Sequence, residues 1–100
     1  MIARLWHGWT KPENADEYEN LLRTWILPEI HRINGYQGAW LMRRDSGAEI
    51  EFITLTLWDS WDAVREFTGP EGHAVVPDVA RKLLSRFDED SIHYEGTWVP

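Results

Sequence analysis

The stretch from residue 49 to 58, EIEFITLTLW, limits the possible folds more than any other part of the sequence. Side chains alternate between the two faces of a strand. One face would carry Ile50, Phe52, Thr54, Thr56 and Trp58, and the other Glu51, Ile53, Leu55 and Leu57. Neither set looks like a solvated surface, so we expect both faces to be covered. Helices of the same chain can cover one face, and the sheet of a second copy is the economical cover for the other.

This strand belongs to a predicted hairpin. Residues 36–44 read as its other strand, and Asp45-Ser46-Gly47 has the composition of the turn between them. Residues 2–10 and 91–99 are rich in large side chains and are predicted as the first and last strands.

Three helical segments are predicted between the strands. The first begins near Pro12, with Asn14 and Glu17 at capping-box spacing, and should kink or break at Pro28, which lacks an N–H group. Ser60 is a good N-cap for a second helix, from Trp61 to about Thr68. A third would start at Pro77 and carry its apolar stripe to Phe87. That stripe is Val79, Ala80, Leu83, Leu84 and Phe87.

The order of these elements predicts the fold. Strand, helix, two strands, helices and a final strand, without repeats or linkers, indicate one domain over residues 1–100. We expect an α+β fold of ferredoxin-like βαββαβ type, with an antiparallel sheet and helices on one face.

Charge and composition disfavour several classes of partner. Ten Lys and Arg against 17 Asp and Glu give a net charge of −7, which opposes binding to nucleic acids and anionic membranes. There is no cysteine, no apolar run of membrane-spanning length and no pattern of a signal peptide. We therefore expect a cytoplasmic protein.

Recognisable catalytic motifs are absent, so we expect no flavin, metal or nicotinamide. His7 would share a strand face with Leu5 and Trp9, where it could be a base, a ligand or a hydrogen-bonded core residue. His73 follows Gly-Pro-Glu-Gly, either at a pocket mouth or in an exposed loop. The Thr54 and Thr56 hydroxyls favour a pocket on their face, because a closed core would have to satisfy them.

Residues 52–67, FITLTLWDSWDAVREF, resemble the antibiotic biosynthesis monooxygenase family of dimeric α+β barrels. The opening MIARLWHGWTKPENADEYENLL, the Gly35-Tyr36 start of the second strand and the tail VVPDVARKLLSRFDEDSIHYE fit the same group, so the resemblance covers nearly the whole chain. It implies a homodimer with a pocket for a small organic molecule. The family contains quinone-forming oxygenases, haem degraders and members of other roles.

The family's site residues map onto a few positions here. Trp58 resembles the pocket Trp of polyketide-tailoring members, while Thr54 stands where they carry Asn and Met42 where they carry His. The haem degraders' Asn and Trp correspond to Leu5 and Phe67. Their axial His falls near Val76, about one turn from His73.

Three functions follow as hypotheses. The first is a cofactor-independent monooxygenase for a phenol-like or anthrone-like substrate, which supplies its own electrons to oxygen once a base has removed a proton. His7 would be the base, Trp58 and Thr54 the donors, and Trp40, Met42 and Phe67 the walls. The second is a haem-binding or haem-degrading protein with His73 as ligand, and the third a non-catalytic small-molecule-binding dimer.

The monooxygenase hypothesis carries a geometric expectation. His7, Trp58 and Thr54 should line one cavity between the sheet and the helices, with His73 near its mouth. The dimer should bury Ile53, Leu55 and Leu57, unless the two faces are reversed and this apolar side lies under the helices.

Overall fold

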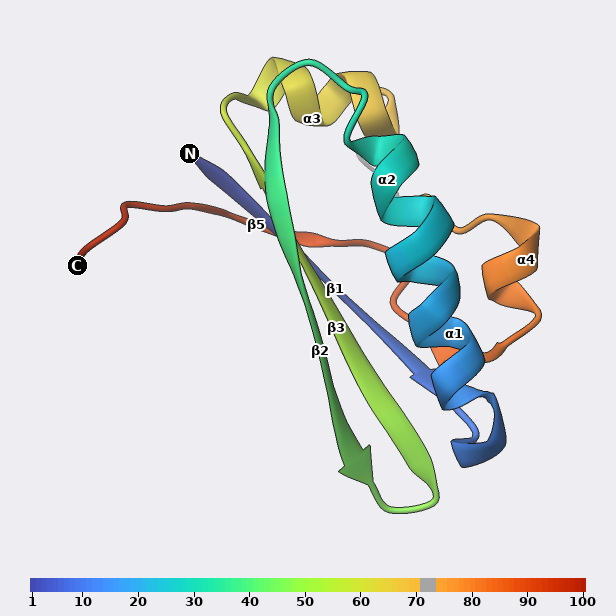
Figure 1. Cartoon of the computed structure of the whole chain (residues 1–100). Coiled ribbons are helices and arrows are strands. Elements are labelled where there is room, and N and C mark those ends of the chain that lie inside the picture. The colour runs from blue at the N-terminus through green and yellow to red at the C-terminus, as the bar shows by residue number, and fades with distance from the viewer. Residues whose placement is uncertain (71–73) are drawn as a thin grey trace.

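Figure 1 shows a computed structural model in which five antiparallel strands form one sheet and the helices lie on one face of it. The structure describes residues 1–70 and 74–100. The strands are β1 (Ile2–Thr10), β2 (Tyr36–Ser46), β3 (Glu49–Trp58), β4 (Leu84–Phe87) and β5 (Ile92–Glu95). Their order is β2-β3-β1-β4, and β5 also pairs with β1.

Two short strands share the outer edge of β1. β5 pairs with its first half and β4 with its last residues. Together they occupy the place of the fourth strand of a ferredoxin-like sheet, so the α+β fold predicted from the sequence is confirmed.

The first helical region is one rod with several kinds of turn. It consists of a 3₁₀ turn η1 (Pro12–Asn14), α1 (Ala15–Leu21), a π-helical turn η2 (Leu22–Ile26) and α2 (Leu27–Ile30). The kink or break predicted at Pro28 takes the form of a widened helical turn directly before it. Such a turn is a common way to accommodate the missing N–H and the bulky ring of a proline. α3 (Trp61–Thr68) and α4 (Asp78–Arg81) follow later.

The predicted capping box is wrong. The Asn14 backbone is already helical, because the 3₁₀ turn precedes it, and its side chain makes no capping bond. The Asn14 amide instead donates to the Leu83 carbonyl at 3.5 Å. The Ser60 cap is confirmed, because its Oγ accepts from the Ala63 N–H at 3.2 Å.

The helix predicted from Pro77 to Phe87 is also wrong beyond its first turn. α4 ends at Arg81, and Leu84–Phe87 is the strand β4. The apolar spacing suits a helix, but the end of β1 offers backbone groups that β4 satisfies by pairing Gly8 with Phe87 and Trp9 with Arg86. Non-local pairing thus overrides the local pattern.

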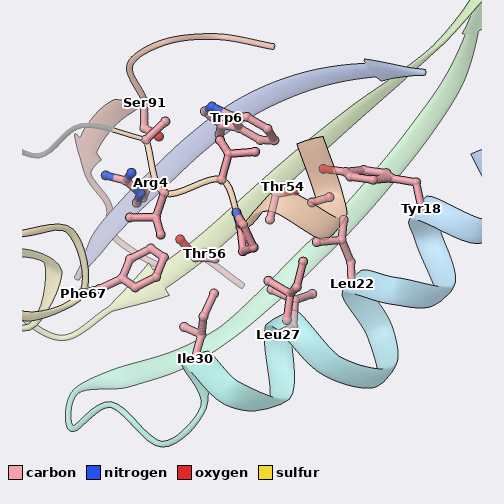
Figure 2. Close-up of a pocket in the computed structure, with 16 residues that line it drawn as sticks. Arg4, Trp6, Tyr18, Leu22, Leu27, Ile30, Thr54, Thr56, Phe67 and Ser91 are labelled. Atoms are coloured by element: carbon pink, nitrogen blue, oxygen red, sulfur yellow. The ribbon is translucent and has the colours of Figure 1, made fainter. Parts of the chain in front are cut away.

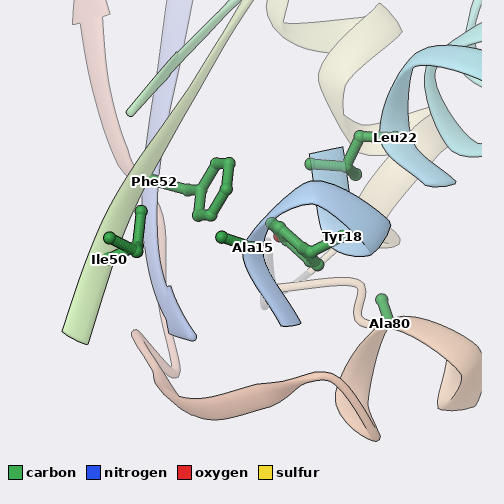
Figure 3. Close-up of a cluster of buried hydrophobic side chains, with 6 residues drawn as sticks. All are labelled: Ala15, Tyr18, Leu22, Ile50, Phe52 and Ala80. Carbon is green, nitrogen blue, oxygen red and sulfur yellow. The ribbon is translucent and has the colours of Figure 1, made fainter. Parts of the chain in front are cut away.

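The register of β1 against β3 determines which side chains enter the core. Trp6 lies opposite Thr54, Gly8 opposite Phe52 and Ile2 opposite Trp58, so the even-numbered residues of both strands share a face. The helices cover this face. Figure 3 shows one of its two buried clusters: Ala15, Tyr18, Leu22, Ile50, Phe52 and Ala80.

Trp58 is the centre of the second cluster. It is 0% exposed and lies against Tyr36 and Phe67, with ring centroids 5.3 and 5.4 Å away. Its indole N–H donates to the Thr56 hydroxyl at 2.9 Å, so its polar atom is satisfied. None of the helices in the described residues is long and apolar enough to cross a membrane.

We expect Trp58→Ala to lower the free energy of unfolding by about 3–5 kcal/mol, because it leaves a large cavity in this cluster. Chemical denaturation followed by circular dichroism measures the change. Trp98→Ala is the matched control, because Trp98 is 85% exposed, and its effect should be below about 0.5 kcal/mol. Equal effects of the two substitutions would contradict this description of the core.

Candidate functional site

A cavity of about 60 Å³ lies between the even-numbered face of the sheet and the helices (Figure 2). Its floor comes from β1 and β3, its roof from α1, η2 and α2, and its sides from α3 and the segment of residues 74–77. The lining residues are Arg4, Trp6, Tyr18, Leu22, Ile26, Leu27, Ile30, Thr54, Thr56, Phe67, Ala74, Val75, Val76, Pro77, Ala80 and Ser91.

Arg4 is the charged residue among the described residues of this lining. It is only 5% exposed, and burial lowers the pKa of its guanidinium to about 10, so it remains a cation at neutral pH. Its Nη1 donates to His93 Nε2 at 2.9 Å, and its Cζ lies 5.6 Å from the centroid of the Phe67 ring. An aromatic face and a neutral imidazole therefore hold the cation at the cavity wall.

Hydroxyl groups supply most of the remaining polarity. Thr54, Thr56 and Ser91 all line the cavity. Thr56 Oγ1 accepts the indole N–H of Trp58. The Ser91 Oγ atom is buried and has no hydrogen-bond partner in the described part of the chain.

The rest of the wall is apolar or aromatic. The Trp6 N–H donates to the Asp88 carbonyl at 2.7 Å, which leaves the ring itself to contact the cavity. Burial raises the pKa of the Tyr18 hydroxyl well above its ordinary value, so Tyr18 stays neutral. Leu22, Ile26 and Leu27 complete this side.

Two of the residues predicted for the site line the cavity, namely Thr54 and Phe67. Trp58 lies on the same face but under Phe67, with the two rings stacked at an interplanar angle of 19°. Its N–H already donates to Thr56 rather than to the cavity. Trp58 is therefore part of the core beneath the site.

The prediction that His7 shares a cavity with Thr54 is wrong. His7 lies opposite Ile53 in the sheet, whereas Thr54 lies opposite Trp6. Directly opposed residues project from the same face, and successive residues project from opposite faces. His7, Leu5 and Trp9 therefore lie on the face away from the helices.

The register places two more predicted wall residues on that far face. Trp40 lies opposite Leu55 and is 66% exposed, and Met42 lies opposite Ile53. Neither lines the cavity. The predicted role of His73 falls outside the residues that the structure describes.

His7 belongs instead to a charged cluster on the far face. Its Nδ1 lies 2.9 Å from Asp88 Oδ2, and its Nε2 lies 3.7 Å from Glu51 Oε2. Its backbone carbonyl also accepts the Asp88 N–H at 3.0 Å. These contacts join the end of β1 to the residue that follows β4, which is a structural role.

Sequence reasoning missed Arg4, Trp6 and Ser91. A lone arginine between apolar residues in MIARLWHGW was the available signal, because a charge at an inward position of a strand needs a reason to be there. No comparable signal marked Ser91, since a serine in a polar turn is ordinary.

Comparison with known proteins adds no assignment. A scan against protein-family models and a search of curated proteins each return no match. Within residues 1–70 and 74–100, no three His, Asp or Glu side chains are grouped to hold a metal ion. The cavity and its polar groups therefore carry the functional argument.

The Arg4–His93 contact predicts a pH dependence of stability. Burial, and then the charge of Arg4, lower the pKa of His93 below its ordinary value of 6.5. The unfolded chain therefore takes up this proton first as the pH falls through about 6.5, and stability declines until the folded state is protonated too. His93→Gln should lose less stability between neutral and mildly acidic pH than the unmodified protein. Denaturation midpoints across this range test it, and an identical decline in both proteins would contradict it.

Proposed function

We propose that this protein binds a small aromatic molecule in the cavity between the sheet and the helices. The observation that supports this most directly is the lining itself, which combines aromatic and aliphatic walls with a few polar groups. Ligand pockets in proteins typically have this composition, because apolar contact supplies affinity and isolated polar groups set orientation.

Cofactor-independent oxygenation is the reaction we propose for such a ligand. The position of the Arg4 guanidinium favours it, because a cation in an apolar pocket stabilises the substrate anion that must form before electrons pass to oxygen. His7 cannot be the base from the far face of the sheet. No His, Asp or Glu is among the lining residues that the structure describes, so a substrate that ionises readily by itself suits the site best.

We expect nitrophenols and hydroxylated quinone precursors to quench the tryptophan fluorescence, because Trp6 lines the cavity. An oxygen electrode then tests the reaction, with uptake expected only from compounds that bind. Leu27→Trp should abolish both signals by filling the cavity, while His7→Ala should leave turnover within about twofold. Binding without oxygen uptake would contradict the oxygenase reaction and support a protein that only binds the ligand.

Haem binding remains the alternative from the resemblance. No histidine is among the described residues that line the cavity, and His73 lies outside them. The geometry therefore favours an aromatic ligand. Addition of haem without a shift and sharpening of its Soret band would exclude this alternative.

We also propose that the protein works as a homodimer joined through the far face of the sheet. The helices cover only the even-numbered face, so the other retains a continuous apolar surface. Its members are Leu5, Trp40, Met42, Ile53, Leu55, Leu57, Ile92 and Tyr94. A patch of this kind is typical of a protein interface.

Leu55→Glu should convert the dimer to a monomer, because Leu55 lies between Leu5 and Trp40 at the middle of this surface. Sedimentation at micromolar concentration measures the change. Val79→Glu is the matched control, since Val79 is an apolar residue that is 40% exposed but lies on α4. A monomeric unmodified protein, or equal effects of both substitutions, would contradict the proposed interface.

A further inference from the structure

The cavity has two chemically different ends. Figure 2 shows Arg4, Ser91 and Phe67 gathered at one end, with Tyr18, Leu22 and Leu27 at the other. We propose that the ligand is a single-ring aromatic acid whose ionised oxygen group binds Arg4 and Ser91. This inference rests on the proposed aromatic pocket and names the class of molecule that fills it.

The Arg4 guanidinium supplies the charge for this recognition. It is buried on the cavity wall, where a cation loses most of its hydration and gains from a nearby anion. Its guanidinium carries five N–H groups, which can donate to more than one acceptor at a time. The planar guanidinium also matches the geometry of a carboxylate.

Ser91 supplies the second contact. Its hydroxyl is buried, lines the cavity and has no hydrogen-bond partner within the described residues. Buried hydroxyl groups are nearly always hydrogen-bonded, so a missing partner indicates a bound water or ligand. Ser91 and Arg4 both line the cavity, and His93, two residues after Ser91, lies opposite Arg4 in the sheet, so one acidic group can contact both side chains.

The opposite end limits the remainder of the ligand. Leu22, Leu27 and the Tyr18 ring offer no charge to pair with a second ionised group. The volume of about 60 Å³ is too small for a fused three-ring system. A ring with a single acidic group at one end therefore matches the polarity of the lining.

Calorimetric titration with benzoate and its neutral counterpart benzamide tests the proposal. We expect benzoate to bind at least tenfold more tightly, and Arg4→Met to remove that difference while benzamide binding persists. Arg32→Met, on an exposed arginine of the helical side, should change neither. Titration with 4-nitrophenol at pH values above and below its own pKa shows whether a phenolate binds as tightly as a carboxylate.

Ser91→Ala keeps the proposal testable if Arg4→Met does not fold. It removes a buried hydroxyl without a partner, so the melting temperature should stay the same or rise, while benzoate affinity falls severalfold. Equal binding of benzoate and benzamide would overturn the acid proposal and leave the aromatic pocket intact. Binding of no aromatic compound would overturn both, and unchanged benzoate affinity in Ser91→Ala would exclude Ser91 as a ligand contact.

Discussion

The antiparallel register between β1 and β3 is the constraint on which the rest of the structure depends. Nine consecutive residue pairs, from Ile2–Trp58 to Thr10–Ile50, divide every side chain of the two central strands between two faces. A shift by one residue would exchange the faces completely. It would place His7 under the helices and Arg4 on the far face. Both the core and the cavity therefore depend on this one alignment.

The outer edge of β1 connects the fold to the candidate site. β5 pairs with Ile2–Leu5, and this pairing brings His93 opposite Arg4. The side-chain contact between them then holds the guanidinium at the cavity wall. The last strand therefore contributes to the site although only Ser91, which precedes it, lines the cavity.

The two faces of the sheet have different roles because they meet different surroundings. The face under the helices combines large core residues such as Phe52 and Trp58 with a small cavity. The far face carries apolar side chains near its middle and a charged cluster of His7, Glu51 and Asp88 towards one end. Arg44 joins this cluster by pairing with Glu51 at 2.7 Å, so a permanent cation matches one of its two carboxylates.

The sequence by itself determined the strands of the hairpin, the first strand and α3. Their signals are local: the alternation in residues 49–58, the turn before them and the Ser60 cap act within a few residues of the chain. It also determined that Thr54 and Trp58 share a face, since that follows from their spacing on one strand.

Only the tertiary structure decided which residues of one strand meet those of another. The spacing of Leu83, Leu84 and Phe87 fits a helix. Residues 84–87 nevertheless form a strand that pairs with β1, because the backbone groups of β1 require a partner. Likewise, no local pattern distinguishes a pairing of Thr54 with Trp6 from one with His7. The register depends on many non-local contacts at once, and that is why Arg4 and Ser91, rather than His7, define the polar end of the cavity.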